Sequence, residues 1–236
     1  MLQELFGHVV IGDSSDALHH IQRDDINVVA CPFPMAAAAM SYVDALELSW
    51  DGEFISEIRR RHSSAQSFNT IILATMFFEA DEEPLSETLH ARLSLLPEAH
   101  GKRELAEGLV AAARLYGAQA PGRTRLEIQL KVKYPNASGT WHADNRLDKR
   151  CFSTLNVAAS GTYGRPNQTV GDWESRRDEY DNDFGAFGKD HMAEAFVIPP
   201  RYLAIWKGWI HRRPFIHSEV TSDYSTTPRL VLLIQR

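Results

Sequence analysis

Hydrophobic and polar residues alternate regularly from Leu126 to Tyr134. Every second residue of this stretch is apolar, and the residues between them are Glu, Gln and Lys. Successive side chains of an extended chain point to opposite faces of a sheet, so a period of two is that of a half-buried strand. The pattern predicts a strand over 126–134, followed by a turn over the Pro-Asn-Ala-Ser-Gly sequence at 135–139.

The rest of the second half of the chain has short apolar stretches separated by turn residues. Strands are predicted over 151–157, 194–198, 202–206 and 229–234, and turns at 161–164, 199–200 and 207–208. Short strands at this spacing are typical of a β-sandwich or barrel. The long polar stretch 171–190 contains glycine and predicts a loop, which is either a lid over a site or a surface insertion.

The first half has longer, helix-like patterns. Helices are predicted over 35–48, 54–61, 86–96 and 102–116, with Gly117 as the C-cap of the last, and a short helix after the capping residues at 13–16. A strand is predicted over 26–31, whereas 70–78 fits a strand or a buried helix. Pro121-Gly122 marks the change of pattern, so we predict one α+β domain over 1–236, with a mainly helical layer (1–120) outside a β core (121–236).

Composition narrows the class of protein. The chain has 236 residues, 44% hydrophobic and 24% charged, which is typical of a globular domain with a core. A net charge of −6 gives no reason to expect a nucleic acid as partner. Cys31 and Cys151 are too few for a disulfide framework and are expected to be reduced. Without a signal-peptide pattern or a long apolar run, we expect a soluble cytoplasmic protein with no membrane contact.

The candidate chemistry begins with His142 and Asp144, directly after the predicted turn. Residues two apart in extended chain share a face, so this pair can bind one metal ion, although a lone His-x-Asp also occurs in surface turns. A third ligand is needed. His211 follows a glycine turn 69 residues after His142 and is preferred. His217, twelve residues before Arg229, is the alternative, but its setting before the polar stretch 221–227 indicates a surface excursion.

The order His142-x-Asp144, His211 and Arg229 resembles that of Fe(II)- and 2-oxoglutarate-dependent dioxygenases. The resemblance covers roughly the second half of the chain and implies a double-stranded β-helix core of the jelly-roll or cupin kind. It also implies that the two histidines and the aspartate bind Fe(II). Arg229 would then bind the far carboxylate of the co-substrate 2-oxoglutarate, and Tyr134 would hydrogen-bond it.

A second resemblance covers more of the chain. The segments 32–34, 142–145, 211–214 and 229–230 are similar to an uncharacterised bacterial family, domain of unknown function eighteen-twenty-six. That family has no established activity, so this resemblance bears on architecture more than on the reaction.

The residue types agree with the chemistry that the first resemblance implies. Two imidazoles and one carboxylate leave three positions of an octahedral metal open, which suits non-haem iron but also other divalent ions. The planar fork of arginine binds a carboxylate with two hydrogen bonds. We therefore predict an oxygenase that uses O₂ to oxidise a small-molecule or amino-acid-like substrate. The alternatives are a cupin-like metalloprotein that does not use 2-oxoglutarate, and a non-catalytic metal-binding or sensing protein.

Overall fold

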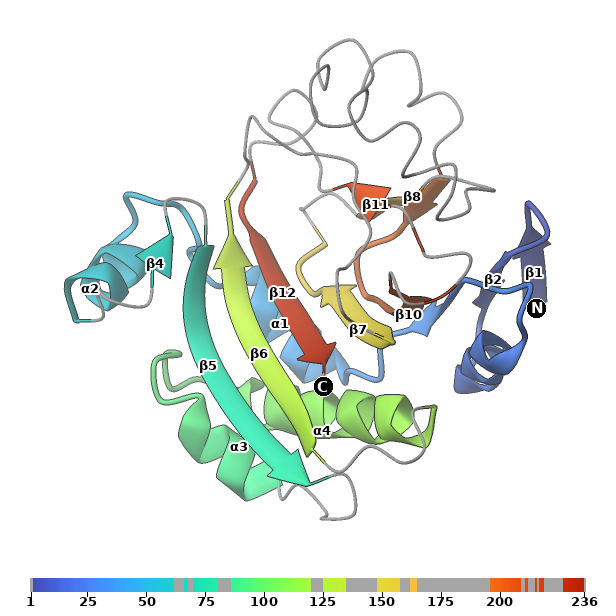
Figure 1. The fold of residues 1–236 in the computed structure, drawn as a ribbon. Coiled ribbons are helices and arrows are strands. Elements are labelled where there is room, and N and C mark those ends of the chain that lie inside the picture. Colours follow the sequence, from blue (N-terminus) through green and yellow to red (C-terminus); the bar gives the residue numbers. More distant parts are fainter. Residues whose placement is uncertain are drawn as a thin grey trace, which may run out of the picture.

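The fold is mixed α/β, with a nine-stranded sheet and a three-stranded sheet (Figure 1). The computed structural model describes residues 2–61, 66–67, 70–79, 86–119, 125–134, 148–157, 162–164, 196–208, 211, 215, 217–218 and 227–235. The predicted loop over 171–190 and the segment with His142 and Asp144 lie outside these residues.

The strands of the large sheet come from both halves of the chain. In spatial order they are β1 (Leu2–Leu5), β2 (Val9–Gly12), β3 (Val28–Pro32), β10 (Tyr202–Lys207), β7 (Lys149–Thr154), β12 (Arg229–Gln235), β6 (Arg125–Lys133), β5 (Thr70–Glu79) and β4 (Gln66–Ser67). All neighbours are antiparallel except β2 and β3. The stretch 70–78 is thus a strand, and the first 120 residues supply strands as well as helices.

The small sheet has the order β11 (His217–Ser218), β8 (Thr162–Gly164) and β9 (Phe196–Ile198). The prediction of a turn at 161–164 is wrong for 162–164, because β8 pairs with β9 on one side and with β11 on the other. A three-residue strand of this kind is stabilised by its non-local partners, and Gly161 before it and Gly164 at its end made the sequence look like a turn.

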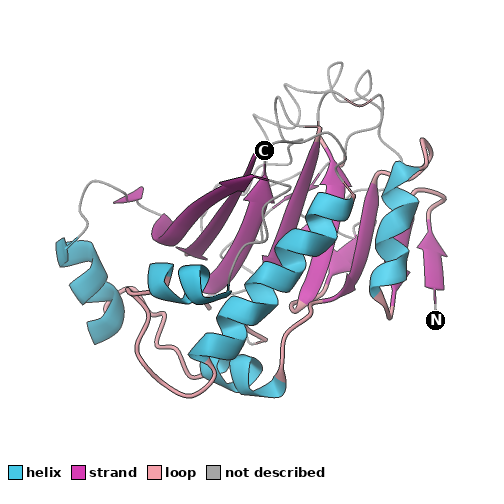
Figure 2. Cartoon of the chain, turned by 90° about the horizontal axis from the view of Figure 1, so that it is seen from below, coloured by secondary structure: helices cyan, strands magenta, loops and turns pink. Residues whose placement is uncertain are grey.

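Helices cover one face of the large sheet (Figure 2). They are the 3-10 helix η1 (Ser15–Gln22), α1 (Ala37–Asp44), α3 (Ser86–Arg92) and α4 (Lys102–Ala118), whereas α2 (Glu53–Arg61) lies at the end of the sheet that carries β4 (Figure 1). The apolar side of α4, with Leu105, Leu109 and Tyr116, is buried. Three predicted helix ends are wrong: α1 ends at Asp44 instead of residue 48, α3 ends at Arg92 instead of residue 96, and Gly117 lies inside α4, whose C-cap is Gln119.

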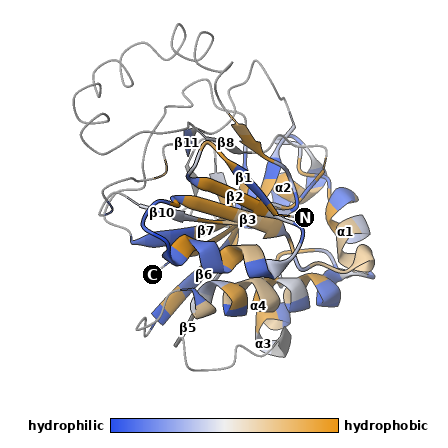
Figure 3. Ribbon diagram, turned by 90° about the vertical axis from the view of Figure 1, so that its right-hand side faces the viewer, coloured by the Kyte–Doolittle hydropathy of each residue, from blue (hydrophilic) through white to orange (hydrophobic). Residues whose placement is uncertain are grey.

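Two hydrophobic clusters lie on the two faces of the large sheet. The first packs between the sheet and the helices, and the second packs between the two sheets. Strand β12 contributes to both: Leu230 and Leu232 belong to the first cluster, Val231 and Leu233 to the second. A strand that is buried on both faces reads as a continuous apolar run, and β3, which also contributes to both clusters, is coloured mostly as hydrophobic in Figure 3.

Both cysteines lie in the core. Cys31 on β3 and Cys151 on β7 are free thiols with at most 1% of their surface exposed. Burial raises the pKa of Cys31 to about 11 and also raises that of Cys151. Within the described residues, no helix is both long and apolar enough to cross a bilayer.

Candidate functional site

Arg229 is a buried cation at the start of β12, and only 6% of its surface is exposed. Successive side chains of a strand point to opposite faces, so Arg229 lies on the face opposite to Leu230 and on the same face as Val231. That face borders the space between the two sheets. Burial lowers the pKa of the guanidinium to about 10, so it stays protonated at neutral pH. A charge in such a place requires anionic or hydrogen-bonding groups around it.

Asn156 fixes the backbone on both sides of Arg229. Its amide nitrogen Nδ2 donates to the carbonyl oxygen of Pro228, and its Oδ1 accepts from the amide nitrogen of Leu230, both at 2.8 Å. Asn156 is itself buried, and its neighbour Leu155 donates its own N–H to the carbonyl of Leu230. The start of β12 is therefore held rigidly against the end of β7, and the guanidinium of Arg229 projects from a fixed backbone.

His217 is buried on β11 of the small sheet, with 4% of its surface exposed. The interpretation of this residue as part of a surface excursion is wrong. Its Nδ1 lies 3.3 Å from the carbonyl oxygen of Phe215. A hydrogen bond from Nδ1 to a backbone carbonyl is the usual orientation of a metal-binding histidine.

Aromatic rings pack against the imidazole of His217. Its ring stacks on Phe215, with centroids 5.3 Å apart and planes at 11°, and lies 4.8 Å from the ring of Trp206 on β10. Gly164 is its cross-strand partner on β8. A Cβ at that glycine would come within 2.5 Å of Phe196 and Phe215, so only glycine leaves room for these rings. The imidazole thus borders the cluster between the sheets.

His211 lies elsewhere, at the opposite end of β7 from Arg229. Its Nε2 makes a short hydrogen bond with a carboxylate oxygen of Asp148, the residue before β7, and its backbone N–H donates to Gly208. Arg229 lies next to Asn156, beyond the other end of that strand. Eight residues of extended chain span roughly 25 Å, so the structure does not bring His211 and Arg229 together.

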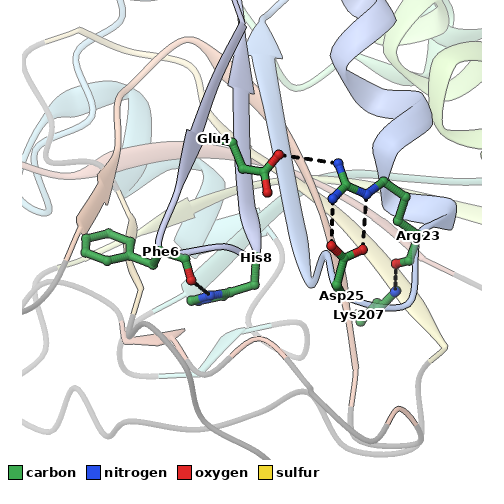
Figure 4. Close-up of polar contacts among 6 residues, drawn as sticks. All are labelled: Glu4, Phe6, His8, Arg23, Asp25 and Lys207. Atoms are coloured by element: carbon green, nitrogen blue, oxygen red, sulfur yellow. Dashed lines mark hydrogen bonds and ion pairs between the residues drawn. The ribbon is translucent and has the colours of Figure 1, made fainter.

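Ion pairs stabilise the end of the large sheet near His211. Arg23 bonds Asp25 at 2.6 Å and Glu4 at 3.4 Å, and Lys207 donates from Nζ to the carbonyl of Arg23 at 2.6 Å (Figure 4). The pairing with Arg23 lowers the pKa of Asp25, whereas burial lowers that of Lys207. In these surroundings the bond between His211 and Asp148 is one more contact that joins neighbouring chain segments.

Tyr134 lies directly after β6, and its position alternates with Lys133, the cross-strand partner of Arg229. Its ring belongs to the cluster on the helix face and meets the ring of Trp50 edge-on at 4.8 Å. The hydroxyl is buried and has no hydrogen-bond partner among the described residues, and burial raises its pKa. The expected role of Tyr134 in co-substrate binding stays a prediction.

His142 and Asp144 lie outside the described residues, so their role as metal ligands also stays a prediction. Within the described part of the chain, no three His, Cys, Asp or Glu side chains form a group that could hold a metal ion. Thr154 and Asn156 are polar residues of the site region that the sequence pattern did not select. Their one signal is their position at the end of the apolar stretch 151–157.

A cavity of about 390 Å³ lies away from these residues, on the outer helices. It is lined by Glu47, Glu53, Phe54, Glu57, Ile58, Arg61, Ser94 and Leu95. The carboxylate of Glu57 accepts hydrogen bonds from Arg60 and Arg61, which lower its pKa to about 2. It is thus ionised and paired at neutral pH, and no side chain predicted to bind metal or co-substrate lines this cavity.

Comparisons with known proteins concern the fold. No family model and no curated protein matches the chain. A dioxygenase for auxin oxidation from Arabidopsis thaliana, solved with 2-oxoglutarate, has a TM-score of 0.49 at 12% identity over 97% of this chain and 91% of that one. A Pseudomonas putida prolyl-4-hydroxylase has a TM-score of 0.43 at 10% identity over 94% and 98%.

A third solved structure is the Kdo hydroxylase KdoO, a non-haem Fe(II) α-ketoglutarate-dependent dioxygenase in its apo form. Its TM-score is 0.42 at 10% identity, over 97% of this chain and 88% of that chain. At these identities and TM-scores, none of the three proteins assigns a role to a residue of this chain. The resemblance to the uncharacterised bacterial family stays a prediction.

Proposed function

We propose that this chain is an Fe(II)- and 2-oxoglutarate-dependent oxygenase that oxidises a small-molecule or amino-acid-like substrate. The observation that carries the proposal is a buried guanidinium and a buried imidazole on two facing sheets: Arg229 on β12 and His217 on β11. The core between them would be a double-stranded β-helix, with the helices on its outside.

The proposed metal ligands are His142, Asp144 and His217. The sequence favoured His211 for the third position, but its ring is bonded to the carboxylate of Asp148 and its side chain is 28% exposed. His217 has the properties that a ligand requires: it is buried, and the carbonyl of Phe215 holds Nδ1. When bound, iron would supply the site that binds the keto acid and activates O₂.

The protein residues would bind and orient the co-substrate. The charged fork of Arg229 suits the far carboxylate of 2-oxoglutarate, because a carboxylate is an acceptor with two oxygens in one plane. The hydrogen bonds from Asn156 to residues 228 and 230 would keep that fork in place. The rings of Trp206, Phe215 and Phe196 would exclude water from the inner wall of the site.

An anaerobic titration with Fe(II) and 2-oxoglutarate tests the proposal without knowledge of the substrate. A weak visible charge-transfer band is expected for the wild-type protein, because the keto acid chelates the metal. The band should disappear in His217→Ala and persist in the matched control His211→Ala. A wild-type protein without the band would overturn the proposed function, and a band lost only in His211→Ala would overturn the assignment of His217.

Trp206 provides a second readout that does not depend on the co-substrate. Its ring is 4.8 Å from that of His217, so a transition-metal ion with a partly filled d shell at this imidazole should quench its fluorescence. The quenching by Co(II) should be smaller in Trp206→Phe and absent in His217→Ala. Equal quenching in all three proteins would mean that the metal binds elsewhere.

A further inference from the structure

Arg201 has a backbone conformation that is unfavourable for arginine. It lies in the turn between β9 and β10, and its φ of 63° is in the left-handed region. A residue with a Cβ is strained there, because the Cβ comes too close to the following carbonyl oxygen. Apart from glycines, only Phe6 has a positive φ among the described residues, and Phe6 precedes Gly7 in the tight turn between β1 and β2. Strain of this kind persists only where the surroundings fix the residue, and it is concentrated at functional sites.

The main chain and the side chain of Arg201 both bind the end of β7. The N–H of Arg201 donates to the carbonyl oxygen of Thr154 at 2.6 Å, and its Nε donates to the carbonyl oxygen of Leu155 at 3.2 Å. Its own carbonyl oxygen accepts from the N–H of Phe33 at 2.8 Å. In this conformation a single residue therefore bonds two successive carbonyl oxygens of the chain that leaves β7.

Asp44, the last residue of α1, binds the same segment two residues further along. Its Oδ1 accepts from the N–H of Val157 at 3.2 Å, and its Oδ2 makes an ion pair with Nη2 of Arg201. The two side chains are 22% and 37% exposed, and ion pairs with such exposure contribute little to global stability. What the pair does is local: it fixes the backbone at Leu155 and at Val157, and Asn156 lies between these two points.

We propose that Arg201 and Asp44 are positioning residues for Arg229 and act through Asn156. The inference rests on the proposed function and deepens it. Asn156 bonds the residues on both sides of Arg229, each at 2.8 Å, so a shift of the backbone at 155–157 is transmitted to the start of β12. Hydrogen bonds tolerate a change of only about half an ångström in length, and a displaced guanidinium loses the fork geometry that a carboxylate requires.

Amide hydrogen exchange of the metal-free protein tests the positioning itself. The N–H of Leu230 is bonded to Asn156, so its exchange rate reports whether Asn156 is held in place. Arg201→Gly relieves the strain and removes only the side-chain bonds, so Leu230 should exchange about three- to thirtyfold faster while the melting temperature stays close to that of the wild type. The matched control is Arg23→Ala, which removes the ion pair with Asp25 and should leave the exchange of Leu230 unchanged.

Binding titrations test what this positioning does for the ligand. In the anaerobic Fe(II) complex, Arg201→Gly should weaken the binding of 2-oxoglutarate about three- to thirtyfold. It should not weaken the binding of 2-oxobutyrate, which keeps the keto acid and lacks the far carboxylate. Asn156→Ala should also weaken 2-oxoglutarate binding, and adding Arg201→Gly to it should have little further effect, because both changes act through the same side chain. Asp44→Asn keeps an acceptor for Val157 and should have a smaller effect in the same direction.

Unchanged exchange of Leu230 or unchanged 2-oxoglutarate affinity in Arg201→Gly would overturn the inference. Additive effects of Arg201→Gly and Asn156→Ala, or an equal loss for both keto acids, would overturn it too. A merely structural role would lower the melting temperature and speed exchange throughout the large sheet. If Arg201→Gly does not fold, Arg201→Asn replaces it, since asparagine tolerates the left-handed region. A wild-type protein that binds neither keto acid would overturn the proposed function, whereas the exchange of Leu230 would still decide whether Arg201 positions Asn156.

Discussion

At the scale of single residues, the environment of Arg229 is the most unusual in the described part of the site. The guanidinium is almost fully buried, and desolvation shifts its pKa downward to about 10. Arginine tolerates such a shift because its intrinsic pKa is so high that the side chain stays charged in the physiological range. A lysine in the same place starts about two units lower and would be shifted in the same direction.

Arg229→Lys should therefore make co-substrate binding depend on pH. Burial depresses the pKa of a cationic amine, so the lysine is charged at low pH and loses its proton as pH rises through the depressed pKa. The affinity of the variant for 2-oxoglutarate should fall between about pH 6 and pH 9, whereas that of the wild type should be flat up to about pH 9. Binding titrations at several pH values measure this. Parallel profiles for the two proteins would contradict it.

Sequence reasoning selected Arg229, whose role stays a prediction, and preferred His211 over His217 as the third ligand. Arg229 is visible as a cation that opens an apolar, β-prone run. The structure distinguishes the histidines by burial and by partner, since His217 is buried against aromatic rings whereas His211 is bonded to Asp148. Spacing along the chain does not carry that information. The glycine turn before His211 was a real signal, but it marks the corner where Gly208 donates its N–H to Asp148.

At the scale of elements, the small sheet depends on the close fit of Gly164. This glycine pairs with His217, and the rings of Phe196 and Phe215 occupy the space where a side chain would stand. Phe215 in turn stacks on the imidazole. The position of His217 is thus coupled to the packing of β8 against its neighbours.

Gly164→Ala should destabilise the protein and disturb metal binding. The added methyl group overpacks two buried rings, which costs about 1–3 kcal/mol. The matched control is Gly117→Ala in α4, where the nearest atom to a new Cβ is Leu126 Cδ1 at 3.8 Å. That change should be neutral or should stabilise by about 0.5–1 kcal/mol. Urea unfolding measures both variants, and a Gly164→Ala protein as stable as the control would contradict the packing.

The longer elements could be predicted from sequence, and the short ones could not. The alternation in 126–134 predicted β6 to within one residue at each end, because one face of that strand is buried. The stretch 70–78 stayed ambiguous until its pairing with β6 was known. Strand β8 is too short to show any period, and its stability comes from two partners remote in sequence.

At the scale of the whole molecule, the large sheet contributes one face to each of the two hydrophobic clusters. Helices pack on one face and the small sheet on the other, so the central strands are shielded on both sides. The thiols of Cys31 on β3 and Cys151 on β7 belong to this sheet and are buried. The reactivity of these thiols therefore reports whether the large sheet is intact.

Neither thiol should react with a disulfide reagent in the native protein. Both are inaccessible, and a pKa of about 11 for Cys31 leaves about a thousandth of it as thiolate at pH 8. Both should react together when urea unfolds the chain, along the same transition that circular dichroism follows. Rapid labelling of either cysteine without urea would show that the sheet opens locally. Cys31→Ser and Cys151→Ser assign the signal to one thiol or the other.

The borders of the large sheet also affect how the protein behaves at high concentration. An outermost strand with unsatisfied backbone groups is a template on which another chain can add, and long flat borders promote aggregation. Here one edge strand is β4, with two residues, and the other is β1, with four. Strand β1 also carries Glu4, which Arg23 holds in an ion pair. Such short, partly charged borders give an incoming chain few backbone groups to pair with, so they disfavour the growth of intermolecular sheets.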